Sequence, residues 1–231
     1  MFDMSNELPI AEKVLVLSPH PDDETIGCGG AICNYIKKGS NVTIAFATNG
    51  ENGLSNNKMK ESPLTRRKEA LNSANILGVQ NLHWLDLPDG GLSHKITELR
   101  EQIEILNRRV RPQIIYIPSY FEEHPDHFAL CKAFAESNIE YNGLIALYEV
   151  WSPLRPNFLL NISRWIKIKE KALNSYCSQQ EFNHITKMML ALNEYRGARQ
   201  PWIRALYAEA FRMVDYSNLK VEFKKFCTIY N

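Results

Sequence analysis

The sequence predicts an α/β fold with a mostly parallel sheet, helices on both faces of the sheet and a helical C-terminal extension. Short apolar runs alternate with segments of helical periodicity over residues 14–150. The first runs are continuously apolar, which is typical of strands that are buried on both faces. The segments between the runs are long enough to hold the crossover helices that neighbouring parallel strands require.

The elements follow in order along the chain. The apolar runs predict five strands, over residues 14–17, 42–47, 82–87, 114–117 and 144–150. The segments between them predict helices over residues 27–38, 63–77 and 93–109. Ser62 and Ser93 are expected to cap two of these helices, Gly39 and Gly78 to end two, and Pro118 to end the fourth strand. This pattern is Rossmann-like.

Beyond Trp151 the pattern changes to three consecutive segments of helical spacing, over residues 167–178, 185–196 and 202–213. We expect these helices to wrap around the sheet. No linker separates them from the strands, and a chain of 231 residues is compatible with one domain, so residues 1–231 are expected to form a single domain.

The composition excludes several classes of protein. Lys and Arg total 27 against 26 for Asp and Glu, so no charge excess predicts a nucleic-acid partner or an anionic membrane. No apolar stretch approaches the roughly 18 residues of a membrane span. The five cysteines form no CxxC pair, and the N-terminus lacks the cationic and apolar segments of a secretory signal. We therefore expect reduced thiols and a cytoplasmic protein.

Two polar motifs follow directly after predicted strands. The motif PHPDDE, residues 19–24, follows the first strand, and HPDH, residues 124–127, follows the fourth. In a sheet of order 3-2-1-4-5 these two strands are neighbours, and ligands bind outside the carboxyl ends of such strands. The two motifs are therefore expected to converge on one site.

The residue types in the motifs suit a divalent metal. His20 and Asp23, three residues apart at the start of a helix, can face one centre, and His127 would complete a set of three ligands. Three protein ligands leave one position open for water, as in catalytic zinc sites. Two histidines and one carboxylate also suit Fe²⁺. Asp22, beside the ligands, is a candidate base for that water.

The two motifs in combination resemble the PIG-L/LmbE-like family of zinc-dependent de-N-acetylases. The resemblance extends over nearly the whole chain, because weaker family landmarks are matched by Arg66 with Glu69 and by residues 77–78, 87–90, 178–179 and 208–211. It implies Zn²⁺ as the cofactor, with Fe²⁺ as the alternative, and a small N-acetyl sugar as the substrate. It also implies a homo-oligomer as an alternative to a monomer.

The family pattern implies a role for each matching residue. His20, Asp23 and His127 would hold the metal, and Asp22 would be the general base. A protonated His124 would stabilise the oxyanion, with Asp126 orienting His124. Arg66 and Asp89 match positions near the substrate, where they could hold phosphate or sugar hydroxyls. Some family members carry a tyrosine two residues before the first histidine of the second motif. This chain has Glu122 there, so no residue is assigned to a tyrosine's contribution to stabilising the oxyanion.

Three other functions compete with removal of an acetyl group from an N-acetylated amino sugar. The same centre could hydrolyse a larger conjugate amide, such as that of a thiol conjugate. The chain could instead be a non-catalytic module that binds metal or sugar, although such a module needs neither Asp22 nor His124. A Rossmann-like nucleotide-binding protein would use the glycines at residues 27–30.

Some features are expected to be structural. The glycines at residues 27–30 lack the spacing of a phosphate loop and predict close helix packing instead. Glu24 is expected to cap the following helix in preference to reaching the metal. Residues 167–171 predict a solvated helix face, Cys28 a buried thiol, and Trp151 a side chain of the core or of the pocket.

Overall fold

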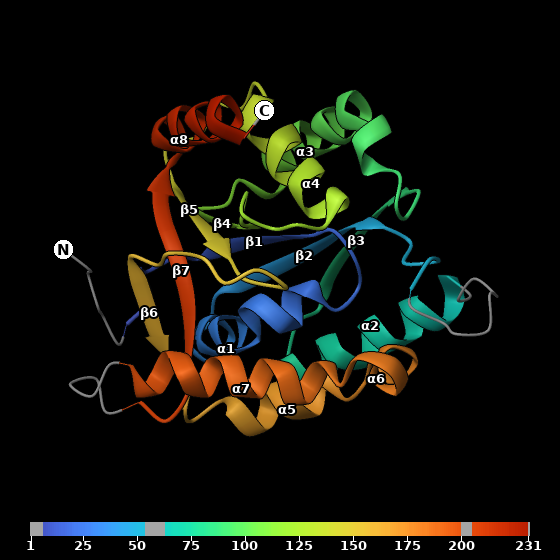
Figure 1. Ribbon diagram of the computed structural model, residues 1–231, viewed down its shortest axis with the longest axis vertical. Helices are drawn as coiled ribbons and strands as arrows, with labels where there is room; N and C mark the ends of the chain where they lie inside the picture. Colours follow the sequence, from blue (N-terminus) through green and yellow to red (C-terminus); the bar gives the residue numbers. More distant parts are fainter. Residues whose placement is uncertain (1–6, 54–62, 200–204, 231) are drawn as a thin grey trace.

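The computed structural model describes residues 7–53, 63–199 and 205–230. Its centre is a seven-stranded sheet in the order β3-β2-β1-β4-β5-β7-β6 (Figure 1). The strands are β1 (Lys13–Ser18), β2 (Asn41–Thr48), β3 (Asn81–Leu87), β4 (Ile114–Pro118), β5 (Leu144–Tyr148), β6 (Phe158–Asn161) and β7 (Ala208–Asp215). The pairs among β1 to β5 are all parallel, so the predicted order 3-2-1-4-5 is confirmed.

Helices cover both faces of the sheet, as the sequence predicts. They are α1 (Asp23–Lys37), α2 (Pro63–Leu77), α3 (Ile96–Val110), α4 (Pro125–Glu136), α5 (Ile166–Leu173), α6 (Cys177–Asn183), α7 (Ile185–Ala198) and α8 (Tyr216–Tyr230), with a 3-10 turn at Leu92–His94. Figure 1 shows α3, α4 and α8 on one side of the sheet and α1, α2, α5, α6 and α7 on the other.

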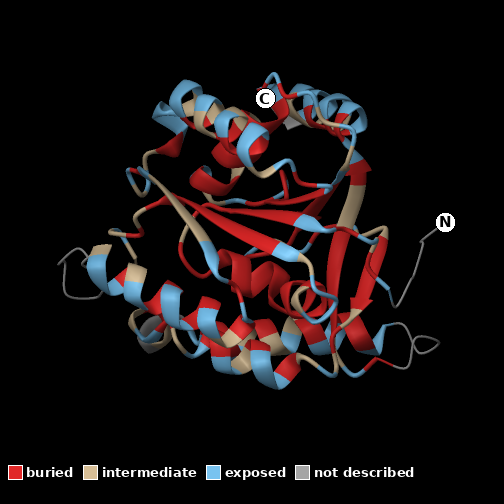
Figure 2. Ribbon diagram, turned by 180° about the vertical axis from the view of Figure 1, so that it is seen from behind, coloured by how far each residue is buried: buried red, intermediate tan, exposed pale blue. Residues whose placement is uncertain are grey.

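The core consists of two apolar layers, one on each face of the sheet. Successive strand residues point to opposite faces, so Val14 and Val16 of β1 belong to the layer under α1, whereas Leu15 and Leu17 belong to the layer under α4. All four side chains are almost completely buried. In Figure 2 the inner strands and α1 are buried over most of their length, while the outer helices alternate between buried and exposed residues. The continuous apolar run thus reflects burial on both faces.

Several boundaries differ from expectation. Helix α1 begins four residues earlier than predicted, at Asp23, and α3 begins at Ile96 with Lys95 as its cap, because Ser93 lies within the preceding 3-10 turn. Gly39 and Gly78 do end helices, each with a φ of +84°, a conformation that favours glycine. The expected cap Ser62 lies outside the described residues.

The predicted helix over residues 202–213 is wrong for its described part. Residues 208–215 form β7, which pairs antiparallel with β5 on one side and with β6 on the other. The sequence predicts no strand over residues 158–161, which form β6. A short apolar run is compatible with a helix or a buried strand, and the open edge of β5 decides in favour of the strand.

The solvated helix face predicted over residues 167–171 is wrong for Lys169. Its side chain is completely buried, and its Nζ donates to Glu209 Oε1 and to the carbonyl oxygen of Ile26, both at 2.7 Å. Lys167, in contrast, is exposed. Among the described residues no helix is long and apolar enough to cross a membrane.

Candidate functional site

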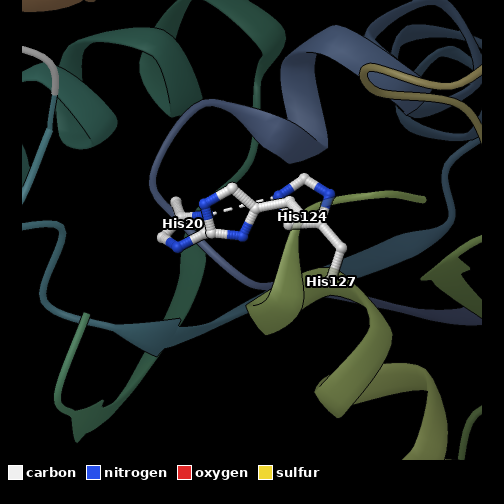
Figure 3. A group of neighbouring side chains, drawn as sticks. All are labelled: His20, His124 and His127. Carbon is white, nitrogen blue, oxygen red and sulfur yellow. Dashed lines mark hydrogen bonds between the residues drawn. The ribbon is translucent and has the colours of Figure 1, made fainter. Parts of the chain in front are cut away.

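The two polar motifs lie side by side at one edge of the sheet. Strands β1 and β4 pair in parallel, with Val14 opposite Ile114 and Val16 opposite Tyr116, so both strands end at the same edge. The loop after β1 carries His20, and the start of α4 carries His124 and His127. Figure 3 shows these three rings gathered together, with a dashed line joining His20 and His127. The predicted convergence is confirmed.

The loop after β1 holds a strained backbone. Asp22 precedes α1 with φ 132° and ψ −32°, a conformation that costs a non-glycine residue about 1–3 kcal/mol and is found mostly at functional sites. The Asp22 N–H donates to Glu24 Oε2 at 3.0 Å, and Tyr176 Oη donates to Glu24 Oε1 at 2.6 Å. Glu24 therefore fixes the loop from inside the protein. Glu24, which the sequence predicts as a helix cap, is therefore a buried residue that fixes the backbone of Asp22.

The second motif forms the N-terminus of α4. His124 caps the helix, Pro125 occupies the first helical position, where its missing N–H costs nothing, and His127 follows in the first turn. The backbone N–H of Asp126 donates to His124 Nδ1 at 3.2 Å. A neutral His124 must then carry its proton on Nε2.

Three ligand atoms form a nearly equilateral triangle. Asp23 Oδ2 lies 3.2 Å from His20 Nδ1 and 3.2 Å from His127 Nε2, and the two nitrogens are 3.3 Å apart. Zinc ligands lie about 2.0–2.1 Å from the metal, and a tetrahedron with such bonds has edges of about 3.3–3.4 Å. One face of a tetrahedral coordination shell matches this triangle, so the three predicted ligands fit a divalent ion.

A second group of candidate ligands contains His124. Ligand atoms of His20, His124 and His127 lie within 4.8 Å of one another. The ring centroid of His124 is 4.8 Å from that of each of the other two histidines. The distances between ligand atoms in this group are limited only to 4.8 Å, whereas those of the triangle with Asp23 are 3.2–3.3 Å, close to the edge length of a tetrahedral zinc site. The geometry therefore favours Asp23 over His124 as the third ligand.

Two carboxylates lie behind His20. Asp126 Oδ2 and Asp89 Oδ1 each lie 3.1 Å from His20 Nε2, so a proton on Nε2 leaves the lone pair of Nδ1 free to face Asp23 and His127. The predicted contact of the Asp126 carboxylate with His124 is absent among the described contacts. That carboxylate also accepts from the N–H groups of Gly90 and Leu92, at 2.7 and 3.0 Å, which turn it toward the loop after β3.

Glu122, to which the sequence assigned no role, lies behind His127. Its Oε2 is 3.5 Å from His127 Nδ1. The same carboxylate accepts from the N–H groups of Val150 at 2.7 Å, Trp151 at 3.0 Å and Ser152 at 3.3 Å. In the sequence, its position two residues before His124 could have indicated that Glu122 belongs to the site. Its partners on the loop after β5 could not be read from the sequence.

Arg66 is buried beside Asp22 instead of being free for a ligand. Its Nη1 donates to Glu69 Oε2 and Ser178 Oγ, both at 3.3 Å, and its Nη2 donates to Asp22 Oδ2 at 3.2 Å and to the carbonyl oxygen of Pro21. The residue is only 1% exposed. These contacts favour a role in holding Asp22 over the predicted contact with substrate.

Burial and neighbouring charges shift the pKa values of the site. Burial raises the pKa of Asp22 to about 7, although Arg66 opposes this shift. Burial also acts to raise the pKa of Asp23, but the positive charge of His127 and hydrogen bonds from both histidines hold it well below its usual range. Burial and the charges of His20 and His127 lower the pKa of His124, which disfavours its predicted protonated form.

The site opens into a pocket of about 530 Å³. Its lining comes from both motifs, from the loops after β2, β3 and β5, and from α2, α6 and α7: His20, Asp22, Asp23, Asn52, Gly53, Arg66, Asp89, Glu123, His124, Pro125, Trp151, Gln179 and Ile185. Trp151 is 39% exposed at the rim, so the pocket alternative is confirmed for this residue. Residues 54–62, which follow Gly53 in the sequence, lie outside the described residues.

Comparisons with known proteins agree with this arrangement. A family model described as GlcNAc-PI de-N-acetylase, PIG-L, matches residues 15–137, a range that includes both histidine motifs. Diacetylchitobiose deacetylase of Thermococcus kodakarensis is 31% identical over 198 residues, which cover 77% of this chain and 74% of that protein. A probable N-acetyl-alpha-D-glucosaminyl L-malate deacetylase 2 of Bacillus anthracis is 28% identical over 235 residues, 93% of this chain and 99% of that protein.

A solved structure shares the fold as well. N,N'-diacetylchitobiose deacetylase from Pyrococcus horikoshii, complexed with its inhibitor, superposes with a TM-score of 0.79 at 28% identity. The superposition covers 93% of this chain and 88% of that chain. The relatives named here are thus deacetylases of N-acetyl sugars, and both their sequences and their fold extend over most of the chain.

Proposed function

The chain belongs to the PIG-L family of de-N-acetylases, and from this membership we propose that it is a metal-dependent hydrolase that removes the acetyl group from an N-acetylated amino sugar. The observation that carries the proposal is the triangle of His20 Nδ1, Asp23 Oδ2 and His127 Nε2, whose edges of 3.2–3.3 Å suit one tetrahedral ion. The donor set suits Zn²⁺, with Fe²⁺ as the alternative.

His20, Asp23 and His127 would hold a divalent ion, which would supply a Lewis acid for the reaction. Asp22 accepts a proton from the attacking water, whose hydroxyl adds to the carbonyl carbon of the acetamide. The proton then passes to the leaving nitrogen, so that acetate and a free amine are the products. The strained backbone at Asp22 and its contact with Arg66, 3.2 Å away, hold the carboxylate in one orientation for this transfer.

His124 donates a hydrogen bond to the oxygen that becomes negative during the attack. Its Nδ1 accepts from the N–H of Asp126, so the donor is Nε2–H of a neutral imidazole. A fixed donor of this kind typically contributes about 10²–10³-fold in rate. Asp126 and Asp89 act on His20, by keeping its proton on Nε2, 3.1 Å from each carboxylate. Arg66 acts as a positioning residue for Asp22.

The test combines metal content with release of acetate. Metal would be measured by inductively coupled plasma mass spectrometry on purified wild type, His127→Ala, His124→Ala and Asp22→Asn. We expect about one zinc or iron ion per chain in all but His127→Ala, since the other two residues are not ligands. Acetate release from N-acetylglucosamine and its disaccharide should fall about 10²–10⁴-fold in Asp22→Asn.

Three results would contradict the proposal. An Asp22→Asn protein that binds metal and still releases acetate at the wild-type rate would exclude Asp22 as the base. Metal lost from His124→Ala but retained by an Asp23→Ala variant would favour the three-histidine group instead. Wild type that binds no metal even when zinc is supplied would exclude the metal-dependent reaction altogether.

A further inference from the structure

We propose that the exposed part of the pocket, formed by Trp151, Glu123 and Asn52, is a saccharide subsite that accepts uncharged sugars and rejects conjugates with a negatively charged group. This inference rests on the proposed function and specifies its substrate class. The family relatives include enzymes named for neutral and for anionic conjugates, so the family alone does not decide between the two.

Apart from the histidines of the proposed metal site, the one cationic side chain among the described lining residues of the pocket is Arg66. That guanidinium is already committed, because its two Nη atoms donate to Asp22, Glu69, Ser178 and the carbonyl oxygen of Pro21. Its Nε is buried and has no hydrogen-bond partner, but it faces Gly50, where an added Cβ would lie 3.0 Å away. Arg66 is therefore not available to a phosphate or a carboxylate.

The rim is acidic. Glu123 is exposed, and its backbone N–H donates to Ser152 Oγ at 3.3 Å, which places it on the same side of the pocket as Trp151. Asp89 also lines the pocket, but its side chain is only 8% exposed, because Oδ1 lies 3.1 Å from His20 Nε2 and Oδ2 accepts the N–H of Asn52 at 2.8 Å. Carboxylates repel an anionic ligand, whereas they accept hydrogen bonds from sugar hydroxyls.

Trp151 supplies an apolar surface for a sugar ring. The residue is 39% exposed, and its backbone N–H donates to Glu122 Oε2 at 3.0 Å, so the side chain extends from a fixed backbone. One face of a pyranose carries mainly C–H groups, and covering an exposed aromatic face with them removes apolar area from water. A pocket of about 530 Å³ is within the usual range for small-molecule sites.

The test compares two neutral sugars of different size with a phosphorylated sugar. Acetate release would be measured for N-acetylglucosamine, its neutral disaccharide and N-acetylglucosamine 6-phosphate. We expect kcat/KM for the phosphorylated sugar to be lower by at least about 10-fold, because the exposed Glu123 carboxylate repels the anion. Raising the ionic strength from about 0.01 to 0.5 M should narrow this difference, since salt screens charges at the rim.

Variants assign the effect to the subsite. Glu123→Gln and Glu123→Lys should progressively reduce the discrimination against the phosphate, whereas Glu101→Lys, the same charge change on the exposed face of α3, should leave it unchanged. Trp151→Ala should raise KM for the disaccharide about 5- to 50-fold with a smaller effect on kcat, and Trp151→Phe should restore most of the binding.

The outcomes separate this inference from the function on which it rests. Equal or faster turnover of the phosphorylated sugar, or discrimination that does not respond to Glu123→Lys, would overturn the inference while leaving the deacetylase proposal intact. No acetate from any of the three sugars would overturn both, because the subsite then has no saccharide to select.

Discussion

Each of the two histidines proposed to bind the metal has a carboxylate behind it. His20 presents Nδ1 to the triangle and Nε2 to Asp126 and Asp89, both 3.1 Å away. His127 presents Nε2 to the triangle and Nδ1 to Glu122, 3.5 Å away. Because an imidazole has one proton when neutral, a carboxylate at one nitrogen determines that the other nitrogen is free for the metal.

At this scale we predict that Glu122→Gln weakens metal binding. Glutamine can accept with one oxygen only, so it loses hydrogen bonds from the N–H groups at 150–152 and its attraction for the His127 ring. Loss of such an outer partner typically lowers metal affinity or activity about 10- to 100-fold. Competition with a chelator measures the affinity. Glu136→Gln, the same change on an exposed residue of α4, should have no effect, and equal affinities for all three proteins would exclude this role.

At the scale of elements, α1 is the helix that positions Asp23, and it packs closely enough to require glycine. An added Cβ at Gly30 would lie 2.3 Å from Ile162 Cγ2, and one at Gly27 would lie 2.2 Å from Tyr148 Cδ2. The interpretation of residues 27–30 as a packing surface is therefore confirmed. These glycines are buried within the helix, so they are not a loop that cradles a phosphate.

We predict that Gly30→Ala destabilises the protein by about 1–3 kcal/mol, since the added methyl group displaces its neighbours. This loss should appear although alanine favours a helix over glycine by about 1 kcal/mol. Urea denaturation gives the free energy of unfolding. Gly29→Ala is the matched control. Its Cβ would lie 3.0 Å from the nearest atom, Lys169 Cγ, so the neighbouring side chain needs a smaller shift than Ile162 does. If the Gly30→Ala protein is as stable as wild type, α1 can move away from Ile162 without loss of stability.

At the scale of the whole molecule, one buried ion pair joins three elements that are distant in sequence. Lys169 of α5 donates to Glu209 of β7 at 2.7 Å, and Glu209 also accepts the N–H groups of Gly30 and Ala31 of α1, at 2.7 and 2.8 Å. Both charged side chains are at most 1% exposed. The C-terminal segments are thereby tied to the helix that carries Asp23.

We predict that Lys169→Met lowers the free energy of unfolding by about 3–5 kcal/mol, because it leaves the Glu209 charge buried without its cation. Adding Glu209→Gln should recover part of this loss, so the double variant should be more stable than the sum of the single effects implies. Urea denaturation of the four proteins measures the coupling. Lys167→Met, on the exposed side of α5, should leave the urea midpoint unchanged. Additive effects of the two buried substitutions would contradict the pairing.

The sequence alone determined the parallel core of the sheet, the order of β1 to β5 and the convergence of the two histidine motifs. These features depend on local patterns, namely apolar runs and polar residues at strand ends, together with general rules for how parallel strands connect. The candidate ligands His20, Asp23 and His127 could be named for the same reason, since each follows closely after a buried strand.

Only the tertiary structure decided which partners the remaining side chains take. The strand at residues 208–215 exists because the edge of β5 is open to it, and Lys169 is buried because Glu209, 40 residues away, lies opposite. The Asp126 carboxylate lies 3.1 Å from His20 Nε2 and also accepts the N–H groups of Gly90 and Leu92, which belong to the loop after β3. Such contacts depend on how segments distant in the sequence pack together, and a local sequence pattern does not predict that packing.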